Sequence, residues 1–201
     1  MFILLVLTLA FAQVGSAIEN PYKKNWGFPG GSPRNGLEIE EQIITYDNFR
    51  EAIRPFNYRW ETFHVTTRDG YKLSMFRITG PIAKDDPDYH HPVPDGYDAE
   101  EYVPKTERID NGKSILMMHG HNMDSEVWFE EKNMGKPMPL QLYDEGYDIW
   151  LGNHRGSNNC EHVPNRISPD NVQLSWDWSY VEMGQYDLPA FILKIKLVTK
   201  V

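Results

Sequence analysis

A short, unbroken apolar run constrains the fold of this chain more than any other feature. Residues 115–118 read Ile-Leu-Met-Met and stop at His119-Gly120, where an irregular polar segment begins. Consecutive apolar residues without alternation are typical of a strand buried on both faces, as in a parallel sheet. The His-Gly step at its end has two explanations. It is a simple turn, or it lets the next backbone amide face an open site.

Upstream of this run, the segment "WETFHVTTRDGYKLSMFRIT" (residues 60–79) predicts a β-hairpin. Apolar and polar residues alternate on both sides of Asp69-Gly70. Two β-type runs that flank Asp-Gly are a strong short-range hairpin signal. A mixed segment before it, residues 39–53, is long enough for a short helix.

Downstream, strand and helix patterns follow each other. We expect a helix over about 139–145 that ends at Gly146, a strand in "YDIWLG" and a helical segment over 179–198. Ser179 and Glu182 fit a capping box. Pro189 predicts a kink or restart, with Asp187 as the cap of the second piece. A hairpin followed by strand, helix, strand and helix indicates an α/β fold with a partly parallel sheet.

Composition narrows the class of protein. A length of 201 residues suits a single domain, and 40% hydrophobic with 24% charged residues is typical of a globular chain. There are 20 basic and 29 acidic side chains, for a formal charge of -9. Because nucleic acid is bound by basic surfaces, this balance argues against nucleic acid as a partner. The only cysteine, Cys160, cannot form an internal disulfide.

An acidic, proline-rich stretch interrupts the pattern at about residues 80–112. It has neither a helical nor a strand period, so we expect a surface insertion or long loop. The stretch contains His90-His91. Adjacent histidines in a loop lack fixed ligand geometry, and the chain shows no partner ligands at zinc-site spacing. No metal or other cofactor is therefore expected.

The N-terminus has the pattern of a secretory signal. Residues 2–12 are apolar but too few to span a bilayer, which takes about 20 residues, so no stable membrane span is expected. Gly15 and Ala17 fit the small positions before a cleavage site. We expect residues 1–17 to be removed and residues 18–45 to form an extension. An uncleaved hydrophobic anchor is the alternative.

Four stretches carry a resemblance to a known family. They are "HVTTRDGYKLSMFRI", "ILMMHGHNMDSEVW", "YDEGYDIWLGNHRGSN" and "WSYVEMGQYDLPAFI", in this order. Together they resemble the acid lipase family of α/β-hydrolases, which includes gastric and lysosomal lipases. The resemblance covers about residues 46–195. It implies that residues 46–201 are the N-terminal portion of an α/β-hydrolase fold, with an incomplete sheet, in a secreted or lysosomal protein.

The resemblance also implies a chemistry, the hydrolysis of lipid esters (triacylglycerols or sterol esters) by a Ser-His-Asp triad. Two backbone N–H groups hold the oxyanion in such enzymes, and one comes from the loop after the third strand. By its place in the motif, that donor is the amide of His121, with His119 and Gly120 supporting the loop. The family usually has Leu-Leu where this chain has His121-Asn122. A backbone amide survives that change, but the polar pair disfavours an apolar acyl pocket.

The chain departs from the family pattern at the nucleophile. No serine has glycine both two residues before and two residues after it, so the Gly-x-Ser-x-Gly elbow is absent. The resemblance places the triad beyond Val201. Two hypotheses follow: the N-terminal part of an acid lipase, inactive alone, or a non-catalytic product that binds lipid or protein. The missing nucleophile strand would leave an open edge from Ile115 to Met118, where another chain can pair.

Two aspartates inside the quoted stretches invite a catalytic interpretation. Asp148 and Asp187 resemble triad acids in type. Their places in the motifs favour structural roles instead. We expect Arg155 to make a structural ion pair, and the two aspartates to act as polar anchors of the fold.

Overall fold

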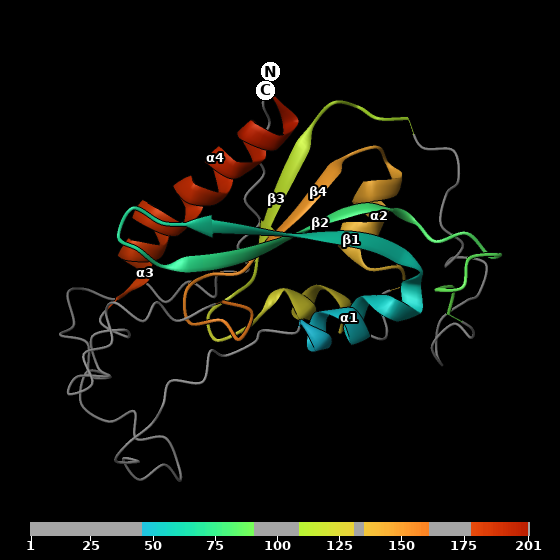
Figure 1. Ribbon diagram of the computed structural model, residues 1–201, viewed down its shortest axis with the longest axis horizontal. Coiled ribbons are helices and arrows are strands. Elements are labelled where there is room, and N and C mark those ends of the chain that lie inside the picture. The colour runs from blue at the N-terminus through green and yellow to red at the C-terminus, as the bar shows by residue number, and fades with distance from the viewer. Residues whose placement is uncertain (1–45, 91–108, 131–134, 161–177, 201) are drawn as a thin grey trace, which may run out of the picture. The chain divides into compact units, whose positions relative to one another are not determined.

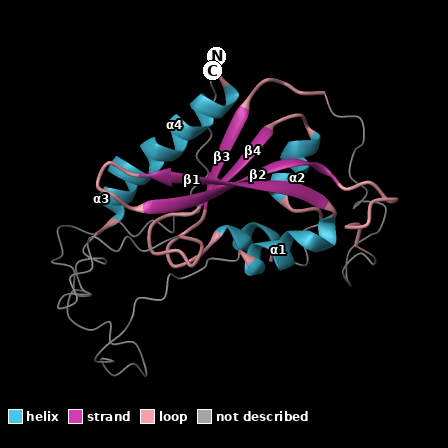
Figure 2. Cartoon of the chain, in the orientation of Figure 1, coloured by secondary structure: helices cyan, strands magenta, loops and turns pink. Residues whose placement is uncertain are grey.

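The computed structural model describes residues 46–90, 109–130, 135–160 and 178–200. Helices and strands alternate along this part of the chain (Figure 1, Figure 2). The principal elements are α1 (Asp47–Ile53), β1 (Tyr58–Thr66), β2 (Lys72–Pro81), β3 (Ser114–Met118), α2 (Met138–Asp144), β4 (Asp148–Gly152), α3 (Tyr180–Glu182) and α4 (Leu188–Thr199). Short 3₁₀ turns lie at Arg54–Phe56 and Ser125–Phe129, and a π-helical turn lies at Met183–Asp187.

The described strands form one mixed sheet in the order β1-β2-β4-β3. β2 is antiparallel to both β1 and β4, whereas β3 and β4 are parallel and are joined through α2. The predicted hairpin is confirmed. Its turn is closed by Thr67 N–H donating to Tyr71 O (2.9 Å), and Gly70 has a φ of 95°. The α/β class with a partly parallel sheet is confirmed as well.

The unbroken apolar run at residues 115–118 lies in β3, and both faces of this strand are buried. Ile115 and Met117 pack into a cluster on the side of α1 and α2, while Leu116 and Met118 pack into a second cluster with α4. Figure 1 shows α4 on one side of the sheet and α1 on the other. Each of these side chains contributes about 1.5–3 kcal/mol when fully buried. This double burial explains why the run has no polar alternation.

The outer edge of β3 pairs with no strand in the part of the chain that the structure describes. Asp148 N–H donates to Lys113 O (2.9 Å), so the carbonyl of Lys113 points to β4. In a parallel pair, alternate residues turn their N–H and C=O groups to the same neighbour. The backbone groups of Ser114, Leu116 and Met118 therefore point away from β4, to an edge that no described strand covers. The sheet is incomplete, as expected.

The predicted α2 and β4 are confirmed, with α2 beginning one residue earlier than expected. Gly146 ends the helix with a φ of 94°, which only glycine adopts readily. A Cβ atom at this position would lie 2.1 Å from Ile109 O. Both the backbone angle and the close approach therefore require glycine here.

The C-terminal helical segment differs from expectation at one residue. The capping box is confirmed, because Ser179 Oγ accepts from Val181 N (3.2 Å) and Glu182 Oε2 accepts from Ser179 N (2.7 Å). The prediction that Asp187 caps a second piece is wrong. Asp187 has helical angles (φ -69°, ψ -53°) and makes no cap hydrogen bond, because its carboxylate is bound by Arg155. The chain instead enters α4 through the π-helical turn, with Pro189 in the first turn of α4.

Several expectations lie outside the described residues. These are the signal (1–17), the extension (18–45) and most of the insertion at 80–112. Its described flanks, 82–90 and 109–113, contain no helix or strand. None of the helices in the described residues has the length and hydropathy needed to cross a bilayer.

Candidate functional site

The loop after β3 turns outward immediately beyond His119. His119 is buried, whereas His121 and Asn122 are exposed, and Asn122 adopts the left-handed conformation (φ 57°). The His121 ring meets the Tyr180 ring edge to face, with 5.3 Å between ring centroids. Within the described residues, the backbone N–H of His121 meets no hydrogen-bond acceptor. The His-Gly step thus leads into a turn at His121-Asn122, and it also leaves a backbone donor available.

His119 holds the peptide that carries this donor. Its Nδ1 lies 2.8 Å from Gly120 O, and its Nε2 accepts a hydrogen bond from His154 N (3.0 Å). An acceptor at Nε2 requires a neutral ring with the proton on Nδ1, which then donates to Gly120 O. Burial lowers the pKa of His119 to about 4, and the nearby His154 acts in the same direction. The ring is neutral near pH 7 and bridges two loops.

The bond to Gly120 O also orients the His121 amide. The carbonyl of residue 120 and the N–H of residue 121 belong to one planar trans peptide, so they point in opposite directions. Holding the carbonyl against the His119 ring therefore directs the N–H of His121 away from that ring. A backbone donor with a fixed direction is one requirement of an oxyanion hole.

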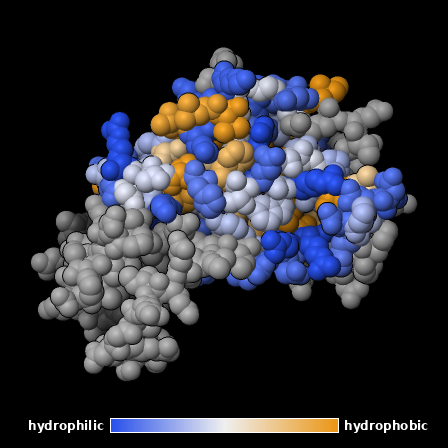
Figure 3. All heavy atoms as spheres, viewed as in Figure 1, coloured by the Kyte–Doolittle hydropathy of each residue, from blue (hydrophilic) through white to orange (hydrophobic). Residues whose placement is uncertain are grey.

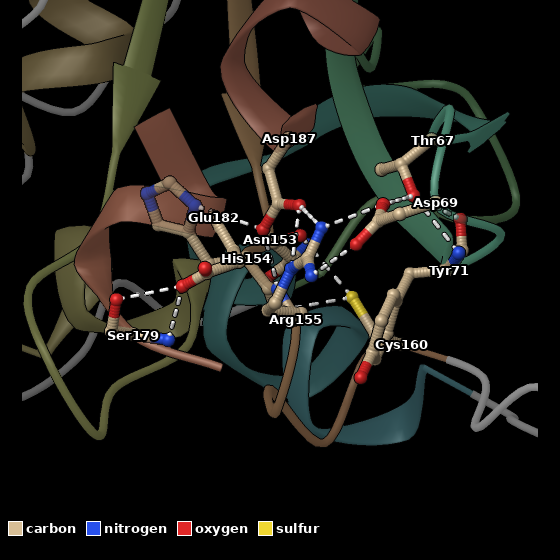
Figure 4. Close-up of polar contacts among 10 residues, drawn as sticks. All are labelled: Thr67, Asp69, Tyr71, Asn153, His154, Arg155, Cys160, Ser179, Glu182 and Asp187. Carbon is tan, nitrogen blue, oxygen red and sulfur yellow. Dashed lines mark hydrogen bonds and ion pairs between the residues drawn. The ribbon is translucent and has the colours of Figure 1, made fainter. Parts of the chain in front are cut away.

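Arg155 forms the centre of a buried ionic network (Figure 4). Its Nε and Nη2 donate to Asp187 Oδ1 (2.8 and 2.6 Å), and its Nη1 donates to Asp69 Oδ2 (2.7 Å). Its guanidinium lies 4.0 Å from the ring centroid of Tyr71. Burial disfavours the charged form, but the hydrogen bonds that the guanidinium donates to both carboxylates raise the pKa of Arg155 overall. The structural ion pair predicted for Arg155 is confirmed.

The two aspartates that resemble triad acids are both engaged elsewhere. Asp187 is completely buried on Arg155. Asp148 accepts from Arg77 Nε (2.7 Å), Ser114 Oγ (2.9 Å) and Trp150 Nε1 (2.7 Å). Their predicted role as polar anchors is confirmed, since each ties segments distant in sequence.

An open cleft of about 490 Å³ lies beside the His121-Asn122 turn. Four of its lining residues carry carboxylates. Its lining consists of Asn48, Glu51, Ala52, Asn122, Met123, Asp124, Glu126, Val127 and Glu130. An acyl chain prefers an apolar lining, so this cleft is not an acyl pocket. The described residues contain no group of three or more His, Cys, Asp or Glu side chains that could hold a metal ion.

Sequence reasoning missed the polar contacts between the loop after β3 and the loop after β4. They involve Asp124, Ser125 and Glu126 on one side, and Asn153, Asn158 and Asn159 on the other. The composition of "NHRGSNNCEH" indicates only a loop. No local signal pairs these side chains with residues about 30 positions earlier.

Comparisons with known proteins match this chain to lipases of the α/β-hydrolase class. Residues 49–132 match the family described as partial alpha/beta-hydrolase lipase region. Lipase lipl-1 of Caenorhabditis elegans is 34% identical over 152 residues, which is 74% of this chain and 31% of that protein. Gastric triacylglycerol lipase of Rattus norvegicus is 30% identical over 162 residues, 81% of this chain and 32% of that protein. The chain therefore spans about a third of the length of the curated relatives it matches.

The mixed sheet, the crossover through α2 and the loop after β3 define the class, a partial α/β-hydrolase. Within that class, the chain belongs to the acid lipase family and corresponds to its N-terminal part.

Proposed function

We propose that this chain supplies the oxyanion-loop part of a fatty-acyl ester hydrolase of the acid lipase type, acting in lipid metabolism on triacylglycerols or sterol esters. The observation that carries the proposal is the His121 amide, which has no acceptor among the described residues and whose peptide plane is held by His119. Several of the matched relatives are called triacylglycerol lipases, which supports the substrate class.

In this proposal the chain contributes one donor to a shared site. The His121 N–H would meet the oxygen of the ester carbonyl as it gains negative charge, and His119 and Gly120 would fix the direction of that N–H. One such donor is worth about 10²–10³ in rate when the rest of the site is present. A nucleophile is also required. None of the serines in these 201 residues has the Gly-x-Ser-x-Gly context.

The proposal predicts that residues 18–201 alone are inactive. They should hydrolyse neither p-nitrophenyl esters nor triacylglycerols above background, and a fluorophosphonate probe should label no serine. Labelling of Ser125 or Ser157 would show that a nucleophile lies outside the family motif.

The role of the His121 amide is tested in a product that continues through a Gly-x-Ser-x-Gly segment. That product should react with the probe and hydrolyse fatty-acyl esters. His121→Pro removes the N–H and should lower kcat by about 10²–10³. His121→Ala keeps the N–H and serves as the matched control. Equal activity of the two variants would contradict the oxyanion assignment.

A second candidate function, binding without catalysis, is favoured by the outer edge of β3, which pairs with no strand among the described residues. Helix α4 also carries exposed apolar residues, Leu193 (59% exposed) and Leu197 (68% exposed). Figure 3 shows apolar side chains gathered over α4. In this alternative the edge from Ile115 to Met118 pairs with a strand of another chain. Light scattering of the chain over a range of concentrations tests this alternative, because strand pairing between copies increases with concentration.

We further propose that the protein is secreted or lysosomal and loses residues 1–17. The short apolar stretch followed by Gly15 and Ala17 supports this. Mass spectrometry of protein from a secretory host should show a start at or close to Ile18. Retention of Met1 in the secreted pool would contradict it.

A further inference from the structure

A single buried asparagine joins the loop after β4 to the loop after β3. Asn153 follows β4 directly and is completely buried. Its Oδ1 accepts hydrogen bonds from Ser125 N (3.0 Å) and Asn159 Nδ2 (3.2 Å), and its Nδ2 donates to Ser74 Oγ (3.2 Å). Its backbone N–H donates to Ser74 O (3.0 Å). Three segments of the chain, including β2, therefore meet on one side chain.

Two neighbouring asparagines extend the contact on either side of Ser125. Asn158 donates to Asp124 through its N–H (3.0 Å, to Oδ1) and through Nδ2 (2.9 Å, to Oδ2). Asn159 Nδ2 lies 3.0 Å from each carboxylate oxygen of Glu126. Both carboxylates are thus met by neutral amide donors from the 153–159 loop. Three consecutive residues of the loop after β3, Asp124, Ser125 and Glu126, are therefore each bound by an asparagine of the loop after β4.

These contacts hold the segment 119–125 at both of its ends. At one end, His154 N–H binds the ring of His119; at the other end, Asn153 Oδ1 binds Ser125 N–H. The two anchors are adjacent residues at the end of β4. The exposed turn that carries His121 lies between them. Its place in space is therefore tied to the end of β4 and, through Ser74, to β2.

We infer that Asn153 is a positioning residue for the His121 amide, an inference that rests on the proposed function. Asn153 touches neither the amide nor any substrate. It acts by binding the backbone N–H with which the 3₁₀ turn begins. Without that acceptor, Ser125 N–H is a buried donor without its partner, which is costly. Local opening of the loop then becomes more favourable, because it lets water bind the Ser125 N–H. The His121 amide loses its fixed direction as a result.

Amide hydrogen exchange on the full chain tests the inference without any ester substrate. Asn153→Ala should raise exchange at residues 121–125 by about tenfold or more relative to the amides of β3, because a local opening is favoured. Ser74→Ala removes the hydrogen bond on the other side of Asn153 and leaves Ser125 N–H paired. It should change the ratio of loop exchange to β3 exchange by less than about threefold.

Two more variants keep the test decisive if Asn153→Ala folds poorly. Asn153→Asp retains an acceptor for Ser125 N–H and should restore most of the loop protection. Asn158→Ala, at an exposed position, should raise loop exchange by about threefold. Equal acceleration of loop and β3 amides in Asn153→Ala would mean a uniform stability role and would overturn the inference. Unchanged loop exchange would overturn it as well.

A kinetic readout separates positioning from stability. In a product that continues through a Gly-x-Ser-x-Gly segment, Asn153→Ala should lower kcat about tenfold and leave KM within about twofold, as for a group that acts only in the transition state. An inactive longer product would contradict the proposed function but leave the exchange result valid. If Asn153→Ala leaves amide exchange at residues 121–125 unchanged, the positioning role is contradicted even when the longer product is active.

Discussion

At the scale of single residues, Arg155 shows how a loop residue stabilises three distant segments. It binds Asp69 in the hairpin turn and Asp187 in the π-helical turn, and it lies in the loop after β4. Its side chain is fully buried, as is that of Asp187, whereas the side chain of Asp69 is 13% exposed. A buried charge that loses its partner is costly, so the two carboxylates differ in importance.

The two carboxylates can be compared directly by amide substitution. Asp187→Asn should lower the free energy of unfolding by about 3–5 kcal/mol, because it leaves Arg155 with a single, partly exposed counter-charge. Asp69→Asn should cost about 1–2 kcal/mol, since water can partly solvate the site. Urea denaturation of both variants measures the difference. A larger loss for Asp69→Asn would contradict the assignment of Asp187 as the principal anchor.

His119 gives the protein a pH dependence of known sign. Its pKa is about 4 in the fold, against 6.5 for an ordinary histidine. Between these values the unfolded chain binds the extra proton, so stability is fully present above about pH 6.5 and is lost as pH falls toward 4. The total loss is about 3 kcal/mol.

His119→Gln keeps an acceptor for His154 N–H but does not titrate. The difference in unfolding free energy between the native protein and this variant should therefore shrink as pH falls from 6.5 to 4. Burial raises the pKa of Glu126, which acts in the opposite direction in both proteins and cancels in the difference. Denaturation midpoints across this range measure the effect, and a pH-independent difference would contradict it.

At the scale of elements, the ends of helices and strands depend on a few backbone positions. Gly146 combines a φ of 94° with the close approach of Ile109 O. Gly70 has a similar φ (95°), but a Cβ atom added there would meet no atom within 4 Å. A side chain at Gly70 would therefore cause backbone strain alone, whereas a side chain at Gly146 would cause both backbone strain and steric overlap. Both positions follow directly from turn and cap signals in the sequence.

Alanine at each glycine tests this separation. Gly70→Ala should cost about 1–2 kcal/mol, the penalty of a left-handed angle alone. Gly146→Ala should cost about 3 kcal/mol or more, because the new Cβ also displaces the backbone at Ile109. Thermal unfolding of the two variants gives the comparison. Equal losses would show that the Ile109 segment moves aside freely.

At the scale of the whole molecule, the described sheet ends on β3, a buried strand whose outer backbone groups pair with no described strand. Such an edge templates pairing with another chain. We expect the isolated 201-residue chain to self-associate in a concentration-dependent manner. Light scattering measures this, and a clean monomer with cooperative thermal unfolding would contradict it.

A proline at the start of β3 locates the interface. Ser114→Pro removes an outward N–H at the first strand residue, where proline is tolerated, and should shift the chain toward monomer. Ser114→Ala is the matched control, because both variants lose the hydroxyl bond to Asp148 Oδ2 (2.9 Å) but only the proline variant loses the N–H. Equal association of the two variants would place the contact elsewhere.

The sequence by itself determined the elements and the family. The hairpin, β3, α2, β4 and the capping box at Ser179 were all predictable, because periodicity, glycine angles and caps act over a few neighbouring residues. The four quoted stretches were sufficient for the acid lipase family. They also singled out His121 by its place in a motif, although its role as an oxyanion donor stays a prediction.

Tertiary structure alone decided which polar groups meet. Asp187 resembled a helix cap in the sequence, but its carboxylate is bound by Arg155, which lies 32 residues away. The chain does not restart there with a capped helix and instead passes through a π-helical turn. Asn153 lies in one of the quoted stretches, but nothing in the sequence pairs it with Ser74 and Ser125, 79 and 28 residues away. A buried polar group takes whatever partner the packed chain brings within hydrogen-bond distance, and a local pattern does not contain that distance.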